Sequence, residues 1–215
     1  MKREIECWTM NETKQYEKLD GLPPYGPMYI SVTDNDEPYF SEGYVVRFFK
    51  SDGSNWVANF RPGWTNYYNI FDYPELKTVI VLAGGHGYIM SPDNEKPKYI
   101  FGLTITDVLQ MSNGSLVCSD GIGIHFFDNS NGQIWQSERI SWDGIIDLEI
   151  KDGILFGKAY DPRNSNQEWS DFSLNLLTKK VEGGTWREFI NNNHNFGVDK
   201  KKKKTWWKIW KRKKE

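Results

Sequence analysis

The sequence has few cysteines and histidines, and it has no apolar run of the length that crosses a membrane. Cys7 and Cys118 form no CxxC pair, and the first 21 residues lack the apolar stretch and small-residue cleavage site of a secretory signal. We therefore expect a cytosolic protein without a structural disulfide. Cys118 follows two apolar residues, which favours a buried strand thiol over a nucleophile.

The three histidines, His86, His125 and His194, are scattered, and no His-x-His or His-x-x-x-His pair provides metal-ligand spacing. Two Asx-rich segments, Asp34–Glu37 and Asp128–Gly132, have oxygen atoms suited to calcium, but neither continues to a later bidentate Glu. Such residues form turns for backbone reasons alone. We expect no metal and no cofactor, and we expect His125 to have a structural, hydrogen-bonded role.

Helical periodicity is weak, and only residues 11–19 favour a short helix. From residue 28 to about residue 184, short alternating or β-branched and aromatic segments are separated by turn residues. Aromatic residues make up 15% of the chain, which suits half-buried sheet surfaces. This pattern predicts an all-β protein.

A polar turn followed by an aromatic residue recurs four times, ending at Trp56, Tyr99, Trp135 and Trp169, which are 43, 36 and 34 residues apart. The last two units also share an upstream hairpin, at residues 107–114 and 147–153. These spacings predict four short β-meander repeats in a propeller or partial propeller.

One hairpin supports this prediction through a resemblance. Asp128-Asn129-Ser130-Asn131-Gly132-Gln133-Ile134-Trp135 resembles the outer hairpin of quinoprotein-like propeller repeats. The resemblance implies shape alone, because the quinone-binding and metal-binding residues of those enzymes have no matching positions in this chain. Residues 25–29 and 138–144 also resemble segments of small uncharacterised bacterial proteins, a resemblance that implies no activity.

The expected organisation has four parts. Residues 1–27 form a polar, proline-rich lead-in, residues 28–186 the β-repeat domain, residues 187–199 a linker, and residues 200–215 a flexible Lys/Trp-rich tail. Ten basic residues and one acidic residue give the tail a net charge of +9, whereas 17 basic and 28 acidic residues leave −11 on the rest. The chain therefore combines an acidic body with a strongly basic end.

The segment Val79–Gly87 at first suggests a glycine-rich phosphate loop. Such a loop needs a helix N-terminus directly after it, but Tyr88-Ile89-Met90-Ser91-Pro92 has the pattern of a second strand ending in a turn. A tight hairpin that uses glycine for positive φ explains the segment better. His86, at its tip, is then a candidate for lining a pocket.

A second candidate region combines carboxylates with tryptophans. Glu138, Asp143, Asp147 and Glu168 have the chemistry of an acid and base pair for glycoside hydrolysis, although their separation cannot be read from the sequence. Neighbouring tryptophans would serve as stacking platforms. The pocket residues expected on these grounds are His86, Trp135, Trp142, Asp143 and Trp169; we assign no catalytic residue.

The tail is the most unusual segment. If helical, it places Trp206, Trp207, Ile209 and Trp210 within about 160° of arc, so that one apolar face is surrounded by cations. Trp favours the headgroup boundary, and each nearby cation adds about 1 kcal/mol of attraction to acidic lipid. The residues expected to bind an anionic membrane or another polyanion are Lys200, Lys201, Lys202, Lys203, Lys204, Trp206, Trp207, Lys208, Ile209, Trp210, Lys211, Arg212, Lys213 and Lys214.

These features favour a non-enzymatic binding protein whose acidic body binds a protein partner and whose tail localises it to the inner membrane face. One form of this hypothesis is a bacterial immunity or defence-accessory protein that neutralises a basic toxin. The alternatives are a carbohydrate-active or other hydrolytic enzyme and, for the tail, nucleic-acid binding through Lys–phosphate pairs and Trp stacking.

Overall fold

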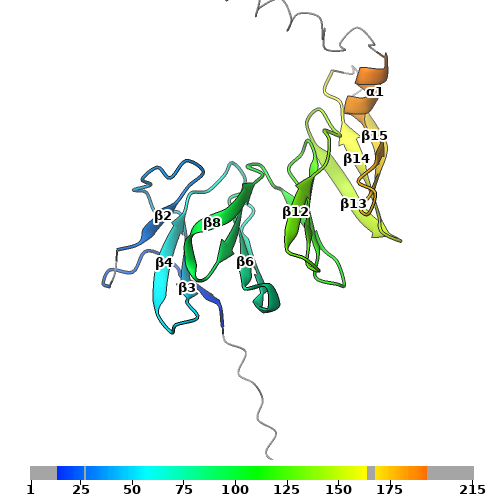
Figure 1. Ribbon diagram of the computed structural model, residues 1–215. Helices are drawn as coiled ribbons and strands as arrows, with labels where there is room; N and C mark the ends of the chain where they lie inside the picture. The colour runs from blue at the N-terminus through cyan, green and yellow to red at the C-terminus, as the bar shows by residue number, and fades with distance from the viewer. Residues whose placement is uncertain (1–13, 27, 164–167, 193–215) are drawn as a thin grey trace, which may run out of the picture. The chain divides into compact units, whose positions relative to one another are not determined.

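The computed structural model describes residues 14–26, 28–163 and 168–192 (Figure 1). The chain divides into two compact units, unit 1 with residues 1–138 and unit 2 with residues 139–215. Their described parts hold four four-stranded sheets and little helix, which confirms the all-β prediction. The predicted tail, residues 200–215, lies outside the described residues.

Unit 1 contains three sheets. Sheet 1 has the order β1-β3-β4-β2, and its strands are β1 (Tyr16–Lys18), β2 (Ile30–Val32), β3 (Tyr44–Phe49) and β4 (Asn55–Phe60). Sheet 2 consists of β5 (Asn69–Tyr73), β6 (Thr78–Ala83), β7 (His86–Ser91) and β8 (Asn94–Phe101), with the 3-10 turn η1 (Pro74–Leu76) between β5 and β6. Sheet 3 consists of β9 (Asp107–Gln110), β10 (Leu116–Ser119), β11 (Ile124–Asp128) and β12 (Gln133–Gln136).

Unit 2 contains sheet 4 and the only helix in the described part of the chain. The strands are β13 (Ile145–Lys151), β14 (Ile154–Tyr160), β15 (Trp169–Asn175) and β16 (Val181–Gly183), and the helix is α1 (Thr185–Asn192). Sheets 2, 3 and 4 are antiparallel meanders, as the repeat pattern predicts. Sheet 1 is built differently, because β2 runs parallel to β4.

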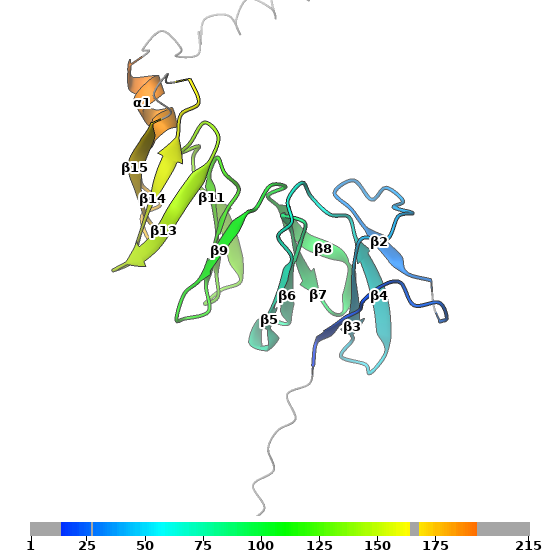
Figure 2. The same cartoon turned by 180° about the vertical axis from the view of Figure 1, so that it is seen from behind.

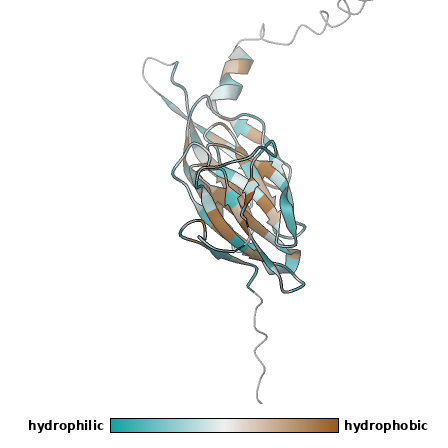
Figure 3. Ribbon diagram, turned by 90° about the vertical axis from the view of Figure 1, so that its left-hand side faces the viewer, coloured by the Kyte–Doolittle hydropathy of each residue, from teal (hydrophilic) through white to brown (hydrophobic). Residues whose placement is uncertain are grey.

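The centre of unit 1 is β6, whose continuous apolar sequence reflects burial on both faces. Val79, Val81 and Ala83 pack in the core shared with sheet 1, whereas Ile80 and Leu82 pack in the core shared with sheet 3. Sheet 2 therefore lies between sheets 1 and 3 in a propeller-like arrangement (Figures 1 and 2). Hydrophobic residues gather within the strands, and the connecting segments are largely hydrophilic (Figure 3).

Cys118 lies in the core between sheets 2 and 3 and is buried. Burial, together with the nearby charge of Asp107, raises the pKa of its thiol to about 12. The thiol therefore stays protonated at neutral pH, and a protonated thiol is a poor nucleophile. This agrees with the prediction of a buried strand thiol.

The repeats are equivalent only in part. Residues 107–114 and 147–153 both connect the first strand of a sheet to its second, as their similarity predicts. Tyr99 and Trp135 both lie in fourth strands, β8 and β12, but Trp169 lies in the third strand of sheet 4. The aromatic residue that follows the polar segment therefore does not mark the same position in every sheet.

The ends of the folded region extend beyond the expected boundaries. Residues 16–18 form β1, where the sequence suggested a helix within a polar lead-in, because Glu17 pairs with Arg47 of β3 at 2.8 Å and the strand closes the edge of sheet 1. At the other end α1 begins at Thr185 and runs into the expected linker. Both elements depend on contacts with distant residues, which local patterns do not reveal.

Candidate functional site

A pocket of about 570 Å³ opens at one end of unit 1, which we call the loop end: residues 33–43, 61–68, 84–85, 102–106 and 120–123. These segments join the strands at the same edge of sheets 1 to 3, the upper edge in Figure 1. The lining includes His86 and His125 together with Asp34, Asp120 and the exposed ring of Trp64. Two histidines far apart in sequence thus face one cavity.

His86 owes its position to the hairpin between β6 and β7. Gly84 and Gly85 form its two-residue turn with φ of +56° and +80°, which glycine adopts without steric cost. This is the tight hairpin expected from the sequence. His86 opens β7 and is buried, so its ring lies at the base of the pocket and not at an exposed tip.

A chain of hydrogen bonds fixes the tautomer of His86. The Tyr88 hydroxyl lies 2.8 Å from His86 Nδ1 and 2.8 Å from the carbonyl oxygen of Arg61. A carbonyl can only accept, so the tyrosine hydrogen points to Arg61 and His86 Nδ1–H donates to the Tyr88 oxygen. In the neutral ring the lone pair is then on Nε2.

Three influences act on the protonation of His86. Burial lowers its pKa most strongly, Asp34 opposes this effect, and Arg61 adds to it. The net result is a pKa below the ordinary value of 6.5. The ring is therefore neutral at physiological pH, with Nε2 available as an acceptor.

Asp120 and His125 form a second buried pair. His125 Nε2 lies 2.8 Å from Asp120 Oδ2, and Asp120 Oδ1 accepts hydrogen bonds from the backbone N–H groups of Gly123 and Ile122. Burial alone would raise the pKa of Asp120, but the hydrogen bond and charge of His125 and the two N–H donors outweigh it, so the pKa lies below its ordinary value. The ionised carboxylate accepts from His125 Nε2–H, and this hydrogen bond fixes the orientation of the His125 ring.

Both histidine rings line the cavity. In the described part of the chain, the one fully buried side-chain nitrogen or oxygen without a hydrogen-bond partner is Trp142 Nε1, in unit 2. Among the described residues His86 Nε2 has no hydrogen-bond partner, so it is not fully buried. The site offers this imidazole acceptor beside the carboxylate of Asp34.

Acidification should destabilise the protein through His86. The unfolded chain has a histidine pKa near 6.5 and the folded chain a lower one, so the unfolded state binds more protons between these values. We expect the free energy of unfolding to fall as pH drops through 6.5, by at most about 1.4 kcal/mol per pH unit for one proton. Urea denaturation between pH 7.5 and 5.5 should show a flatter dependence in His86→Phe. Equal slopes in the two proteins would contradict this assignment.

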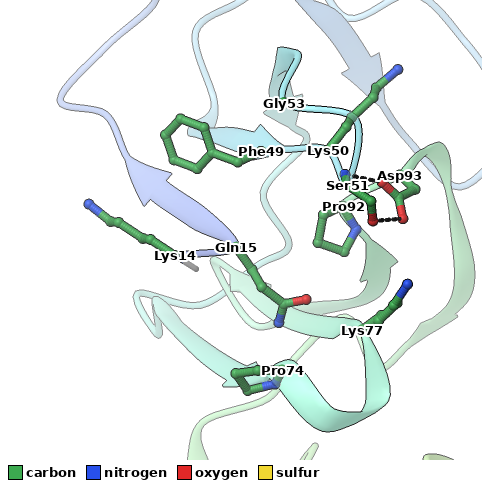
Figure 4. A pocket seen from close by; sticks show the side chains of 10 residues that line it. All are labelled: Lys14, Gln15, Phe49, Lys50, Ser51, Gly53, Pro74, Lys77, Pro92 and Asp93. Carbon is green, nitrogen blue, oxygen red and sulfur yellow. Dashed lines mark hydrogen bonds between the residues drawn. The ribbon is translucent and has the colours of Figure 1, made fainter. Parts of the chain in front are cut away.

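A second pocket, of about 550 Å³, lies at the opposite end of unit 1 (Figure 4). Ser51 donates from its backbone N–H and its hydroxyl to Asp93, and these bonds join the β3–β4 turn to the β7–β8 turn. Lys50 pairs with Glu95 at 3.2 Å, and the side chains of Lys14 and Lys50 point in different directions (Figure 4). The cations do not converge on one point, so this pocket is a weaker candidate than the histidine pocket.

The predicted pocket residues are distributed over the two units. His86 lines the pocket at the loop end of unit 1, whereas Trp135 packs on Phe126 with ring centroids 5.4 Å apart and does not line that pocket. The other three, Trp142, Asp143 and Trp169, belong to unit 2.

Trp142 has a packing role in unit 2. The guanidinium of Arg163 lies 4.1 Å from the centroid of Trp142 and 4.2 Å from that of Phe189, and Arg139 lies 4.2 Å from that of Trp186. These stacked cations and rings hold α1 against the segment that precedes β13. Trp169 packs on Tyr160, with ring centroids 5.0 Å apart.

The Asx-rich turn at Asp128 satisfies its own oxygens. Oδ1 accepts from the N–H and hydroxyl of Ser130, and Oδ2 accepts from the amide of Asn131. The turn is therefore held by internal hydrogen bonds. Among the described residues, no group of three or more His, Cys, Asp or Glu side chains is arranged to hold a metal ion.

Sequence reasoning missed the Asp120–His125 pair and the contribution of Asp34. A signal was present: Asp120-Gly121-Ile122-Gly123 lies between two apolar strands and closes a hairpin that pairs Cys118 with His125. That register brings Asp120 back toward His125. No local pattern connects either residue to His86, which comes from another sheet.

Comparisons with known proteins find no matching protein family and no matching curated protein. Among solved structures, the chain is similar to the computationally designed Ika4 protein, with 15% identity and a TM-score of 0.35 over 57% of this chain and 76% of that one. It is also similar to the designed Ika8 protein, with 13% identity and a TM-score of 0.34 over 67% of this chain and 46% of that one. A third similar structure is the N-terminal domain of Nup159, with 10% identity and a TM-score of 0.35 over 56% of this chain and 34% of that one. The chain spans less than half of the last two, and these distant likenesses carry no function.

No helix in the described residues has the length and apolar character needed to span a membrane.

Proposed function

We propose that this chain is a non-enzymatic binding protein that holds a basic protein partner at the loop end of unit 1. The observation that carries the proposal is the exposure of two large aromatic side chains there, Phe40 at 86% and Trp64 at 80%. Burying such rings against a partner is favourable, and Trp is enriched among the residues that dominate binding energy.

The charge of the loop end supports a basic partner. Its segments contain five acidic residues, Asp34, Asp36, Glu37, Glu42 and Asp120, and one basic residue, Arg61. Arg61 approaches Asp34 only to 4.0 Å, and both side chains are about half exposed. Complementary charge on a partner would speed association and favour the correct orientation.

The hydrolytic alternative has less support. Glu138 belongs to unit 1, whereas Asp143, Asp147 and Glu168 belong to unit 2, and Asp147 pairs with Lys158 at 3.3 Å. Glycoside hydrolysis needs two carboxylates at a defined separation, and the ion pair of Asp147 with Lys158 gives that residue a different role. An immunity or defence-accessory protein that neutralises a basic toxin is one form that the proposed binder would take.

The aromatic side chains provide the test. A partner captured on the immobilised protein from a lysate of the source organism, then purified and titrated, should bind Trp64→Ala and Phe40→Ala at least about tenfold more weakly than the parent chain. The matched control is Leu177→Ala, because Leu177 is as exposed as Phe40 but lies in a turn of unit 2. Equal binding by all variants, or an effect confined to Leu177→Ala, would refute the proposal.

We further propose that residues 200–215, which lie outside the described residues, localise the protein to an anionic membrane. The composition of this segment, with its net charge of +9 and three tryptophans, supports the proposal. The full chain should co-sediment with liposomes that contain anionic lipid, and a chain ending at Asp199 should not. Equal pelleting of both chains would exclude this role, and binding of single-stranded nucleic acid by the full chain alone would favour the alternative.

A further inference from the structure

The pocket at the loop end combines a hydrogen-bond acceptor with negative charge. His86 Nε2 presents a lone pair, and the Asp34 carboxylate lies close enough to influence the charge of His86. Asp120 adds a second negative charge behind His125. A ligand that fits this lining must bring donors, and a positive charge on it would be favoured.

Aromatic rings border the same cavity. Trp64 and Tyr99 line it, and both side chains are at least half exposed. Flat aromatic faces attract guanidinium groups, which stack on them while their N–H groups bond in the plane. An ammonium group is a compact point charge, so it cannot lie flat on a ring while it donates hydrogen bonds in the ring plane.

We infer that this pocket receives an arginine side chain of the basic protein partner, with its guanidinium N–H groups donating to His86 and Asp34. This inference rests on the proposed function and names the chemistry by which the loop end recognises its partner. The incoming guanidinium would replace the loose contact between Asp34 and Arg61, whose closest atoms are 4.0 Å apart.

The protonation state of the pocket makes the affinity for arginine depend on pH. The charged or titratable groups around His86 are Tyr88, which shares a hydrogen bond with its ring, and the pocket groups Asp34, Arg61, Tyr99, Asp120 and His125. Protonating His86 would convert its acceptor into a donor and add a positive charge beside the guanidinium. Binding should therefore weaken on acidification, as the ring of His86 becomes charged.

The test uses the full chain and N-acetyl-L-arginine amide as the probe, followed by the NMR signals of the histidine rings. We expect saturable shifts of His86 and His125 with a millimolar dissociation constant, weaker shifts with N-acetyl-L-lysine amide, and none with N-acetyl-L-citrulline amide. Citrulline keeps the size and planarity of arginine but lacks its charge. The shifts should also diminish as the pH is lowered.

Two aspartates in one loop provide the matched variants. Asp34→Asn should weaken arginine binding up to about fivefold at low salt, whereas Asp36→Asn should leave it unchanged. Asp36 pairs with Lys96 at 2.6 Å and does not line the pocket. Both residues are exposed, so neither change should prevent folding.

Several results would overturn the inference: no saturable shift, equal binding of citrulline or of a neutral sugar such as methyl glucoside, or equal effects of the two aspartate variants. Its failure is distinguishable from failure of the proposed function. If Trp64→Ala weakens partner binding while the arginine probe leaves both histidines unaffected, the binding surface stands and the arginine pocket does not.

Discussion

Gly85→Ala should destabilise the protein by about 4 kcal/mol. The residue has φ of +80°, and a Cβ atom there would lie 2.3 Å from Thr65 Oγ1 and 2.7 Å from the Ile105 carbonyl oxygen. Positive φ alone costs an alanine about 1 to 2 kcal/mol, and overpacking typically adds about 1 to 3 kcal/mol. Ile105 also donates its N–H to the Gly85 carbonyl at 3.0 Å, so the hairpin cannot move aside without losing a hydrogen bond.

Gly53→Ala is the control for the backbone cost. Gly53 has φ of +85°, but no atom lies within 4 Å of the position that its Cβ would take. We expect a loss of about 1 to 2 kcal/mol, from positive φ alone. Urea denaturation followed by tryptophan fluorescence would measure both variants. Equal losses of unfolding free energy would mean that the neighbours of Gly85 move aside at little cost. The close contacts around Gly85 would then not be what fixes the hairpin at the base of the pocket.

The sequence predicted much of this hairpin because its causes are local. Residues 79–92 contain all of the signals: the alternation of apolar residues, the pair of glycines and the strand pattern after them. Together these signals predict a hairpin and exclude a phosphate loop at this position. β6 was predicted for the same reason. Its burial on both faces gives a continuous apolar run, which needs no knowledge of its neighbours to be recognised as a strand.

Features set by distant contacts were harder to predict. The pairing of β1 with β3 and of β2 with β4 joins segments up to about 30 residues apart, and β2 runs parallel to its neighbour where a meander was expected. The predicted pocket residues come from different sheets and from both units, and no local pattern relates the positions of such residues. Trp135 instead packs against Phe126 of the adjacent strand.

The candidate site combines both cases. The sequence makes His86 a candidate lining residue from its own hairpin and gives His125 a hydrogen-bonded role within a strand; the structure places His86 in a pocket lining and pairs His125 with Asp120. What the sequence did not reveal was that β7 and β11 bring these rings to one cavity. The two rings come together because sheets 2 and 3 pack through Ile80, Leu82 and Leu116. The sequence of neither hairpin alone predicts this packing.

Asp120→Ala should cost about 3 kcal/mol of stability. The substitution removes the acceptor of three hydrogen bonds, from His125 at 2.8 Å, Gly123 at 2.8 Å and Ile122 at 3.1 Å. Asp120 and His125 are buried, so water replaces the lost acceptor poorly, and a buried donor without a partner costs about 1 to 3 kcal/mol. Thermal and urea unfolding would measure the loss.

Asp128→Ala is a matched control, because Asp128 also accepts three hydrogen bonds from residues that follow it in a turn. That turn is exposed, so water takes over as acceptor and we expect a loss of about 1 kcal/mol or less. If the two aspartate variants lose equal stability, the buried Asp120–His125 pair stabilises the fold no more than the exposed turn at Asp128 does, which would contradict this prediction.

The pH dependence of Asp120→Ala separates the charge of Asp120 from its packing. Because the folded protein holds the pKa of Asp120 below its ordinary value, ionisation of this group stabilises the fold above the unfolded pKa, near 3.9. That contribution is lost as pH falls through the lower, folded value. The difference in unfolding free energy between the parent chain and Asp120→Ala should therefore shrink in acid. At neutral pH the NMR signal of His125 should shift in the variant, because the ring loses its hydrogen bond to Asp120. A difference that stays constant to pH 3 would mean that Asp120 acts through its shape and not through its charge.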